Sequence, residues 1–312
     1  MKKNVKLGLF GLAAGAVGLG GATALGNYLY EVAMTPRVHD PARDTDPEDP
    51  VFKGRIWLRE HPAMREVTLE AVDGLSLHAY LHYTDDPSCS HRWAVCVHGF
   101  GESAESVGIF GRHYESKGWN VLIPDLRAHG KSEGNHVSYG WEDRLDLVSW
   151  CSWLIRRDPQ AEIILHGISM GGTAVLLTAG GPLPKQVKGV ISDCAFTSAQ
   201  DIIRHVYQER YARLGPFPVM WPALRSAVRR KLKLDLNKVD AVAAVRRSNI
   251  PTLFIHGVAD QLVPPSMMAE LYEHARCPKE FLWVPRAAHA KAAGTNPILY
   301  WSTVDEWLAR LL

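Results

Sequence analysis

Short apolar runs alternate with longer amphipathic segments along most of the chain. Six such runs fall at residues 93–97, 121–123, 163–165, 187–191, 252–255 and 281–284. Strands of this kind are buried on both faces, which happens when helices cover both sides of a parallel sheet. The pattern therefore predicts an α/β fold, with a mostly parallel twisted sheet and helices on both faces.

Two parts of the chain depart from this rhythm. Residues 66–71 and 75–83 have the composition of strands and are joined at Asp73-Gly74, a dipeptide typical of a hairpin turn. The interval between the fourth and fifth apolar runs is much longer than the others and has helical character only. Such an excess predicts a helical cap insertion, at about residues 197–240, that lies over one end of the sheet.

The N-terminal segment has a pattern of its own. Lys2, Lys3 and Lys6 precede an uncharged run at residues 7–30, which is long enough to cross a bilayer. Because basic flanks stay in the cytoplasm, we expect the rest of the chain on the other side of the membrane. The tripeptide Ala-Thr-Ala that ends at Ala24 resembles a signal-peptidase site. A transmembrane anchor and a cleaved signal peptide both stay open.

These features predict a division of the chain into three parts. Residues 1–34 form the anchor or signal peptide, and residues 35–50, rich in Pro and Asp, form an extended linker. Residues 51–312 form one folded domain that includes the cap. We expect a single-pass protein of the cell membrane with an extracytoplasmic domain, or a secreted protein if cleavage occurs near Ala24.

Composition narrows the classes of partner. The chain has 35 Lys and Arg against 33 Asp and Glu, a net charge of +2, so no nucleic-acid partner is expected. The five cysteines are scattered and neither C-x-x-C nor H-E-x-x-H occurs, so no metal and no cofactor are expected. His78 and His82 are four positions apart in a strand, but no third ligand is evident, and we expect both on the surface.

One segment is strongly basic. The predicted cap holds nine basic residues against four acidic ones. One interpretation is a solvated helix face. The other is a basic edge that faces anionic lipid or an acidic substrate and includes Arg229, Arg230, Lys231 and Lys233.

Ser169 stands among glycines where an apolar run meets a helical segment. The stretch from residue 162 to residue 173 reads E-I-I-L-H-G-I-S-M-G-G-T. One interpretation is a strand-to-helix turn in which the serine caps the helix. The other is a nucleophile elbow, a strained turn that exposes the serine hydroxyl and leaves no room for side chains at Gly167 and Gly171. This second interpretation requires a base, an acid and hydrogen-bond donors for an oxyanion.

Other strand ends supply these groups. Ligand sites of open α/β sheets lie beyond the carboxyl ends of the strands, and Asp260 and His289 follow the fifth and sixth apolar runs. A serine needs a neighbouring base, and the imidazole needs a carboxylate that fixes its tautomer. The H-G-F-G loop after the first run leaves the amide of Phe100 free to donate. With the amide of Met170, it forms a candidate oxyanion hole.

The sequence resembles the α/β-hydrolase superfamily over residues 66–312. The order Ser, Asp, His carries the resemblance, as do V-H-G-F-G-E-S, D-L-R-A-H-G-K-S-E-G and I-H-G-V-A-D-Q-L-V-P. The stretch Y-G-W-E-D-R-L-D-L is similar to that of bacterial membrane-anchored or surface hydrolases, which include esterase-, lipase- and serine aminopeptidase-like proteins. The resemblance implies Ser169 as nucleophile, His289 as base and Asp260 as acid, with the amides of Phe100 and Met170 as the oxyanion hole.

Asp193 is the rival acid, because some members of the superfamily place the acid after the preceding strand. The D-x-x-V-P context favours Asp260. Arg127, His129 and Ser132 are expected to brace the loop after residues 121–123, without catalytic roles.

The resemblance also narrows the reaction. A serine at the elbow argues against haloalkane dehalogenases and epoxide hydrolases, and a single Phe100 between two glycines argues against the H-G-G-G type of lipase. The expected reaction is hydrolysis of a carboxylic ester or thioester of a small acyl substrate, through an acyl-enzyme. A serine peptidase or amidase of the same fold, and an inactive binding module, are the alternatives.

Overall fold

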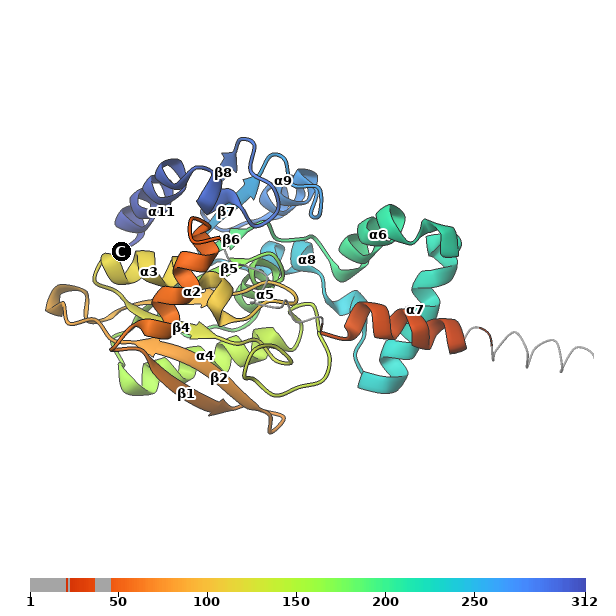
Figure 1. Ribbon diagram of the computed structural model, residues 1–312, viewed down its shortest axis with the longest axis horizontal. Coiled ribbons are helices and arrows are strands. Elements are labelled where there is room, and N and C mark those ends of the chain that lie inside the picture. Colours follow the sequence, from red (N-terminus) through yellow and green to blue (C-terminus); the bar gives the residue numbers. More distant parts are fainter. Residues whose placement is uncertain (1–20, 22, 37–45) are drawn as a thin grey trace, which may run out of the picture.

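The computed structural model describes residue 21, residues 23–36 and residues 46–312, and these contain an eight-stranded sheet (Figure 1). The strand order is β1-β2-β4-β3-β5-β6-β7-β8, with β2 antiparallel to both of its neighbours and the pairs from β4 to β8 parallel. The strands are β1 (Arg65–Glu70), β2 (Ser76–His82), β3 (Arg92–Val97), β4 (Asn120–Pro124), β5 (Glu162–Ile168), β6 (Val187–Asp193), β7 (Thr252–Gly257) and β8 (Lys279–Val284). The predicted fold class is confirmed, and so is the hairpin between β1 and β2.

Each central strand contributes to two separate cores, one on each face of the sheet. In β3, Trp93 and Val95 belong to one apolar cluster, while Ala94 and Cys96 belong to the other. The first cluster includes side chains of α4 (Asp143–Arg157), α5 (Met170–Ala179), α8 (Ala241–Arg247) and α9 (Pro265–His274). The second includes side chains of α2 (Pro50–Glu60), α3 (Gly108–Ser116), α10 (Ala292–Thr295) and α11 (Pro297–Leu311). Burial on both faces explains the unbroken apolar runs in the sequence.

The cap lies between β6 and α8, at one end of the molecule (Figure 1). It consists of α6 (Ala199–Arg210), η4 (Ala212–Leu214), α7 (Phe217–Leu232) and η5 (Leu236–Lys238). A single bridge between Ser198 and Asp240 joins its two ends. The Ser198 hydroxyl accepts a hydrogen bond from the Asp201 amide and thereby starts α6.

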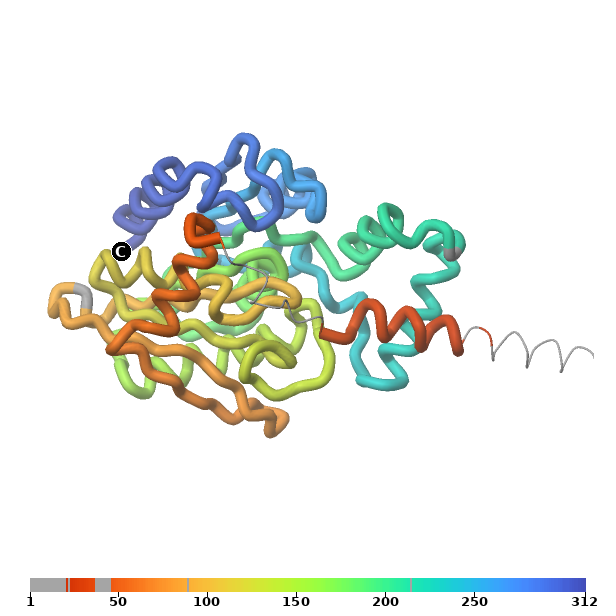
Figure 2. Tube along the Cα trace, in the orientation of Figure 1, coloured from red at the N-terminus to blue at the C-terminus, as the bar shows by residue number. Residues whose placement is uncertain are grey.

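The predicted N-terminal anchor or signal peptide lies largely outside the described residues. Residues 23–34, which are described, are helical and lie beside α7, although they are far from it in the sequence (Figure 2). No helix in the described part of the chain combines the length and hydropathy needed to span a membrane.

The predicted linker differs from the structure at its C-terminal end. Residues 37–45 lie outside the described residues, but residue 50 already begins a helix, α2. The carboxylate of Asp49 accepts a hydrogen bond from the Val51 amide, and Pro50 occupies the first helical position. The short Asp-Pro signal at the end of the Pro- and Asp-rich stretch is therefore a helix start.

The prediction that His78 and His82 lie on the surface is wrong. Both side chains are buried, because β2 lies inside the sheet, between β1 and β4, and both of its faces are covered. The Nδ1 atom of His78 lies 2.8 Å from the Asp125 carboxylate, within hydrogen-bond distance. His82 lies 3.7 Å from the Glu115 carboxylate.

Candidate active site

Ser169 lies in the tight turn between β5 and α5, with a φ of 56° and a ψ of −119°. A side chain at Gly167 would place its Cβ 2.2 Å from the Gly171 carbonyl oxygen, and one at Gly171 would come within 2.3 Å of the Val97 carbonyl oxygen. Both positions therefore require glycine, as the elbow interpretation predicts. The Ser169 side chain makes no capping hydrogen bond to the helix, so its hydroxyl is left for another partner.

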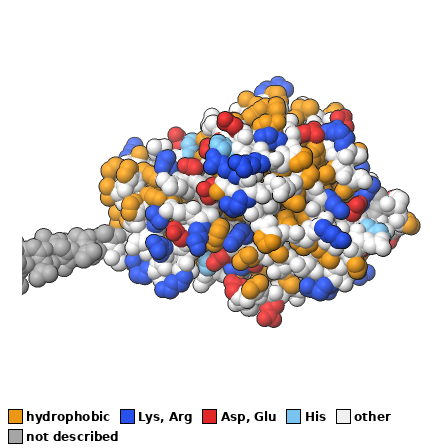
Figure 3. Space-filling model, turned by 180° about the vertical axis from the view of Figure 1, so that it is seen from behind, with side chains coloured by type: hydrophobic (Ala, Val, Ile, Leu, Met, Phe, Trp, Pro, Cys, Tyr) orange, Lys and Arg blue, Asp and Glu red, His pale blue; other side chains and the backbone are white. Residues whose placement is uncertain are grey.

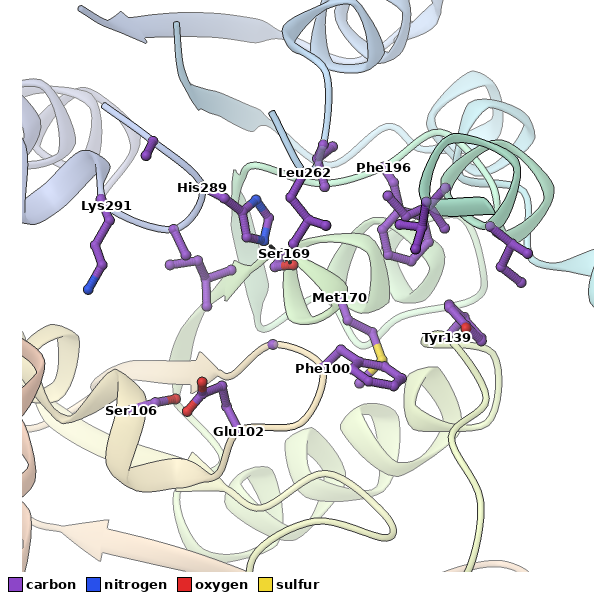
Figure 4. Close-up of a pocket in the computed structure, with 18 of the residues that line it drawn as sticks. Phe100, Glu102, Ser106, Tyr139, Ser169, Met170, Phe196, Leu262, His289 and Lys291 are labelled. Atoms are coloured by element: carbon purple, nitrogen blue, oxygen red, sulfur yellow. Dashed lines mark hydrogen bonds between the residues drawn. The ribbon is translucent and has the colours of Figure 1, made fainter. Parts of the chain in front are cut away.

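That partner is His289, from the loop after β8. Its Nε2 lies 2.8 Å from the Ser169 Oγ (Figure 4). Its Nδ1 lies 2.7 Å from the Asp260 Oδ2. In the parallel sheet, Ile168 pairs with Asp193 and Gly257 pairs with Val284, so the ends of β5, β7 and β8 meet at one edge. The structure thus brings together the three residues that the sequence predicts as a triad.

Asp260 is held in its ionised form, which the acid of a catalytic triad needs. Burial alone would raise the pKa of this carboxyl, but hydrogen bonding with His256 and His289 lowers it well below its usual range. The amides of Leu262 and Val263 donate to the other carboxylate oxygen, each at 2.9 Å. Asp260 therefore stays ionised, fixes the Nδ1–H tautomer of His289 and can stabilise an imidazolium.

Asp193, the rival acid, has different partners. Its Oδ2 accepts a hydrogen bond from the Tyr300 hydroxyl at 3.0 Å, and the Tyr300 hydroxyl in turn lies 2.9 Å from the Nε2 of His166. Complete burial raises the pKa of Asp193 to about 6. The Asp193 side chain thus belongs to a buried polar chain behind the site, while the Nδ1 of His289 is engaged by Asp260.

The candidate oxyanion hole lies between the loop after β3 and the start of α5. Within the described part of the chain, neither the Phe100 amide nor the Met170 amide has a hydrogen-bond acceptor. Figure 4 shows the two side chains next to each other, below Ser169. Two free amides at this place can bind the negative charge of a tetrahedral intermediate.

Two buried histidines fix the Phe100 loop. The Nδ1 of His98 donates to the Gly99 carbonyl at 2.8 Å, and its Nε2 accepts from the Leu126 amide at 2.9 Å. The Gly101 amide donates to the Nε2 of His129 at 3.0 Å. Burial, with the nearby His129, lowers the pKa of His98 to about 4. The Nδ1 of His129 also donates to the Arg127 carbonyl at 2.9 Å, so His129 braces the loop after β4, as predicted. The sequence analysis gave no role to His98 and did not predict the contact of His129 with Gly101.

Arg127 and Ser132 also brace the loop after β4, as predicted. The Arg127 guanidinium binds both oxygens of Asp146, at 2.8 and 2.7 Å, and also Asp73 at 2.9 Å. The Ser132 hydroxyl donates to the Asp125 carbonyl at 2.7 Å. Together these contacts connect the loop after β4 to α4 and to the β1–β2 turn.

Known proteins show the same architecture. The family model of the alpha/beta hydrolase fold matches residues 94–214. Among solved structures, an esterase of Pyrococcus furiosus has a TM-score of 0.63 at 23% identity, over 80% of this chain and 91% of that one. An esterase domain from Rhodothermus marinus has a TM-score of 0.56 at 24% identity, over 79% of this chain and 98% of the domain. The chain has the α/β-hydrolase fold.

The sequence relatives of this α/β-hydrolase-fold chain include bacterial, yeast and plant proteins. The uncharacterized protein YqkD of Bacillus subtilis is 32% identical over 192 residues, which are 61% of this chain. The match spans 62% of YqkD, less than two thirds of its length. The uncharacterized protein YfhR of Escherichia coli K12 is 26% identical over 255 residues, 79% of this chain and 78% of that protein.

A cavity of about 920 Å³ opens onto Ser169 and His289. Most of its wall is apolar, and the cap contributes a large part of it through Ile202, Val206, Tyr207, Phe217, Met220, Trp221 and Leu224. Its volume is near the upper end of the usual range for small-molecule sites, about 300–1,000 Å³. An α/β-hydrolase fold with this cavity can accept a large apolar substrate.

One histidine cluster has spacing that suits a metal ion. The Nε2 of His61 lies 2.6 Å from the Glu115 carboxylate, and the Nε2 of His82 lies 3.7 Å from it. The Ala63 amide, however, donates to the Nδ1 of His61, which places the imidazole proton on Nε2. A metal at Nε2 would require the opposite tautomer. The geometry favours a hydrogen-bonded clip between α2, β2 and α3.

Proposed function

We propose that this protein is a serine hydrolase that cleaves a carboxylic ester or thioester through an acyl-enzyme. The observation that carries the proposal is the unbroken hydrogen-bonded line from the Ser169 Oγ through His289 to Asp260, with distances of 2.8 and 2.7 Å. A line of this kind activates a hydroxyl that is otherwise a poor nucleophile at neutral pH.

In the first half of the proposed reaction, the Ser169 Oγ attacks the substrate carbonyl carbon while the Nε2 of His289 takes the hydroxyl proton. The carbonyl oxygen becomes negative and accepts hydrogen bonds from the amides of Phe100 and Met170. The bond to the leaving group then breaks, and His289 returns its proton to the departing alcohol or thiol. Ser169 is left as an acyl ester.

In the second half, water attacks the acyl-enzyme. His289 takes a proton from the water, a second oxyanion forms against the same two amides, and its collapse releases the carboxylic acid. The proton on His289 returns to Ser169. Asp260 stays ionised throughout and stabilises the positive charge that His289 carries twice in each cycle.

Esters and thioesters are preferred over amides in this proposal, because alkoxides and thiolates leave more readily than amines. The two esterases that share the fold support the same choice, although their likeness shows the fold alone. A peptidase or amidase would show the reverse preference on a matched pair of ester and amide substrates.

We also propose that the N-terminal segment attaches the protein to the cell membrane, or directs its secretion if cleavage occurs near Ala24. In both cases the hydrolase domain acts outside the cytoplasm. The basic residues before the uncharged run at residues 7–30 support this orientation.

A fluorophosphonate probe tests the proposed function directly, because it reacts only with an activated serine. We expect labelling of the parent protein and of Ser302→Ala, which removes an exposed hydroxyl on α11, and no labelling of Ser169→Ala. Absence of labelling in the parent would indicate an inactive binding module. A panel of esters, thioesters and amides would then identify the bond that is cleaved.

A further inference from the structure

The helix at residues 23–34 forms part of the wall of the catalytic cavity. Tyr28, Leu29, Val32 and Ala33 line the same cavity as Ser169 and His289. Leu29 is 7% exposed, and it belongs to the apolar cluster that also contains cap residues. A segment that the sequence analysis assigned to an anchor or signal peptide therefore contributes apolar side chains to the site.

This helix is attached closely to the cap. A side chain at Gly26 would place its Cβ 2.6 Å from the Ala223 carbonyl oxygen on α7, so the two backbones meet at a glycine. The ammonium of Lys231 lies 3.0 Å from the Glu31 carboxylate and 4.0 Å from the centre of the Tyr30 ring. Arg230 also donates to the Asn27 side chain, at 3.0 Å.

These contacts change the interpretation of the basic edge. Lys231 and Arg230 are two of the four cations that the sequence analysis placed on it, and both bind the N-terminal helix. Figure 3 shows Lys and Arg side chains as well as apolar side chains on the surface of the cap. The edge therefore serves at least in part to hold this helix.

The other end of the helix is attached to the catalytic domain. The Tyr139 hydroxyl donates to the Ala33 carbonyl at 2.8 Å, and the Val137 amide donates to the Met34 carbonyl at 2.8 Å. Met34 is fully buried, and Tyr139 also lines the cavity. The helix thus spans the gap between cap and catalytic domain, and closes one side of the cavity.

We infer that residues 28–33 form a wall of the acyl-binding site and that the substrate is an ester of a long-chain acyl group, as in a lipid. This inference rests on the proposed function. A short acyl group would leave most of a cavity of about 920 Å³ unfilled. Each further methylene moved from water to an apolar wall stabilises the complex, so a long chain suits these walls best.

The position of the wall residues in the sequence supports a lipid as the substrate. The uncharged run at residues 7–30 ends within the wall, at Tyr28 and Leu29. A membrane that holds the earlier part of this run would place its lipids next to the cavity, so an acyl chain would travel a short distance from the bilayer to Ser169.

The test compares Val32→Trp, which adds bulk inside the cavity, with Val72→Trp, the same change at a side chain that is 86% exposed in the β1–β2 turn. Hydrolysis of p-nitrophenyl acetate, octanoate and palmitate is measured in detergent with the full chain. For Val32→Trp we expect the ratio of kcat/KM for palmitate to that for acetate to fall about tenfold or more. Val72→Trp should keep the parent ratio.

Two further variants guard against a folding defect at one position. Ala33→Phe should also lower the ratio by filling the cavity, and Gly26→Leu should lower it by separating the helix from α7. Fluorophosphonate labelling of Ser169 verifies that each variant is folded and active. Equal ratios in all labelled variants and the parent would overturn the inference and leave the proposed function intact. Absence of Ser169-dependent hydrolysis in the parent would overturn both.

Discussion

The Nδ1 of His289 lies 2.7 Å from the Oδ2 of Asp260, and this contact joins the loops after two neighbouring strands. It identifies the acid of the proposed triad, because a carboxylate at this distance fixes the imidazole tautomer and stabilises its charged form. The competing carboxylate, Asp193, takes no part in this contact and accepts a hydrogen bond from the Tyr300 hydroxyl.

The two carboxylates should therefore differ in their effect on turnover. Asp260→Asn should lower kcat by about 10⁴-fold, since an amide at this place favours the wrong tautomer of His289. Asp193→Asn should leave kcat within a few-fold of the parent. Steady-state kinetics on one p-nitrophenyl ester separates the two, and the reverse order of effects would assign the acid to Asp193.

Asp193→Asn should instead change stability. Burial raises the pKa of Asp193 in the folded state to about 6, from an ordinary value of 3.8. The folded protein thus binds a proton more tightly than the unfolded chain, so its stability falls as pH rises from about 4 to about 6. The asparagine variant escapes this loss, which is about 3 kcal/mol.

Denaturant unfolding of both proteins at pH 4 and pH 7 measures this effect. Relative to the parent, the variant should have a higher free energy of unfolding at pH 7 than at pH 4. An equal difference at both would mean that Asp193 is not a buried acid with a raised pKa.

His98 should have the opposite dependence on pH. Its pKa is lowered by burial to about 4 in the folded state, from an ordinary value of 6.5. The unfolded chain therefore binds the proton more tightly, so this contribution is complete above about pH 6.5 and is lost as pH falls toward 4. The free energy of unfolding should fall by about 3 kcal/mol. Protonation of His98 should also loosen the Phe100 loop, because His98 holds this loop through the Gly99 carbonyl.

Unfolding of the parent and of His98→Gln between pH 4 and pH 7 checks this prediction. The parent should lose stability on acidification more steeply than the variant. Parallel curves would show that His98 does not titrate in this range.

The orientation of the domain is testable in bacterial cells that express the full chain. If Lys2, Lys3 and Lys6 stay in the cytoplasm, a protease added outside spheroplasts should digest the hydrolase domain or abolish its activity. A cytoplasmic marker protein serves as the control for intact membranes. Digestion only after lysis would contradict the proposed location.

The strands and the catalytic residues could be predicted because their signals are local. Burial on both faces produces unbroken apolar runs, as in β3, and the elbow at Ser169 requires glycine on both sides. Because β7 and β8 are parallel neighbours, their carboxyl ends bring Asp260 and His289 to the same edge of the sheet.

The remaining features depend on contacts between distant segments. The burial of His82 follows from the position of β2 inside the sheet, which its own sequence does not reveal. The contact of Glu31 with Lys231 joins segments that are 200 positions apart. Similarly, the role of His98 as a tether depends on the Leu126 amide, from the end of a neighbouring strand.

The central claim is that Ser169 is a nucleophile activated by His289. Ester hydrolysis by the purified Ser169→Ala variant, next to Ser302→Ala as the matched control, tests it most directly. We expect kcat to fall by roughly 10⁶-fold in Ser169→Ala, with unchanged thermal unfolding, and parent activity in Ser302→Ala. Turnover by Ser169→Ala near that of the parent would contradict the claim.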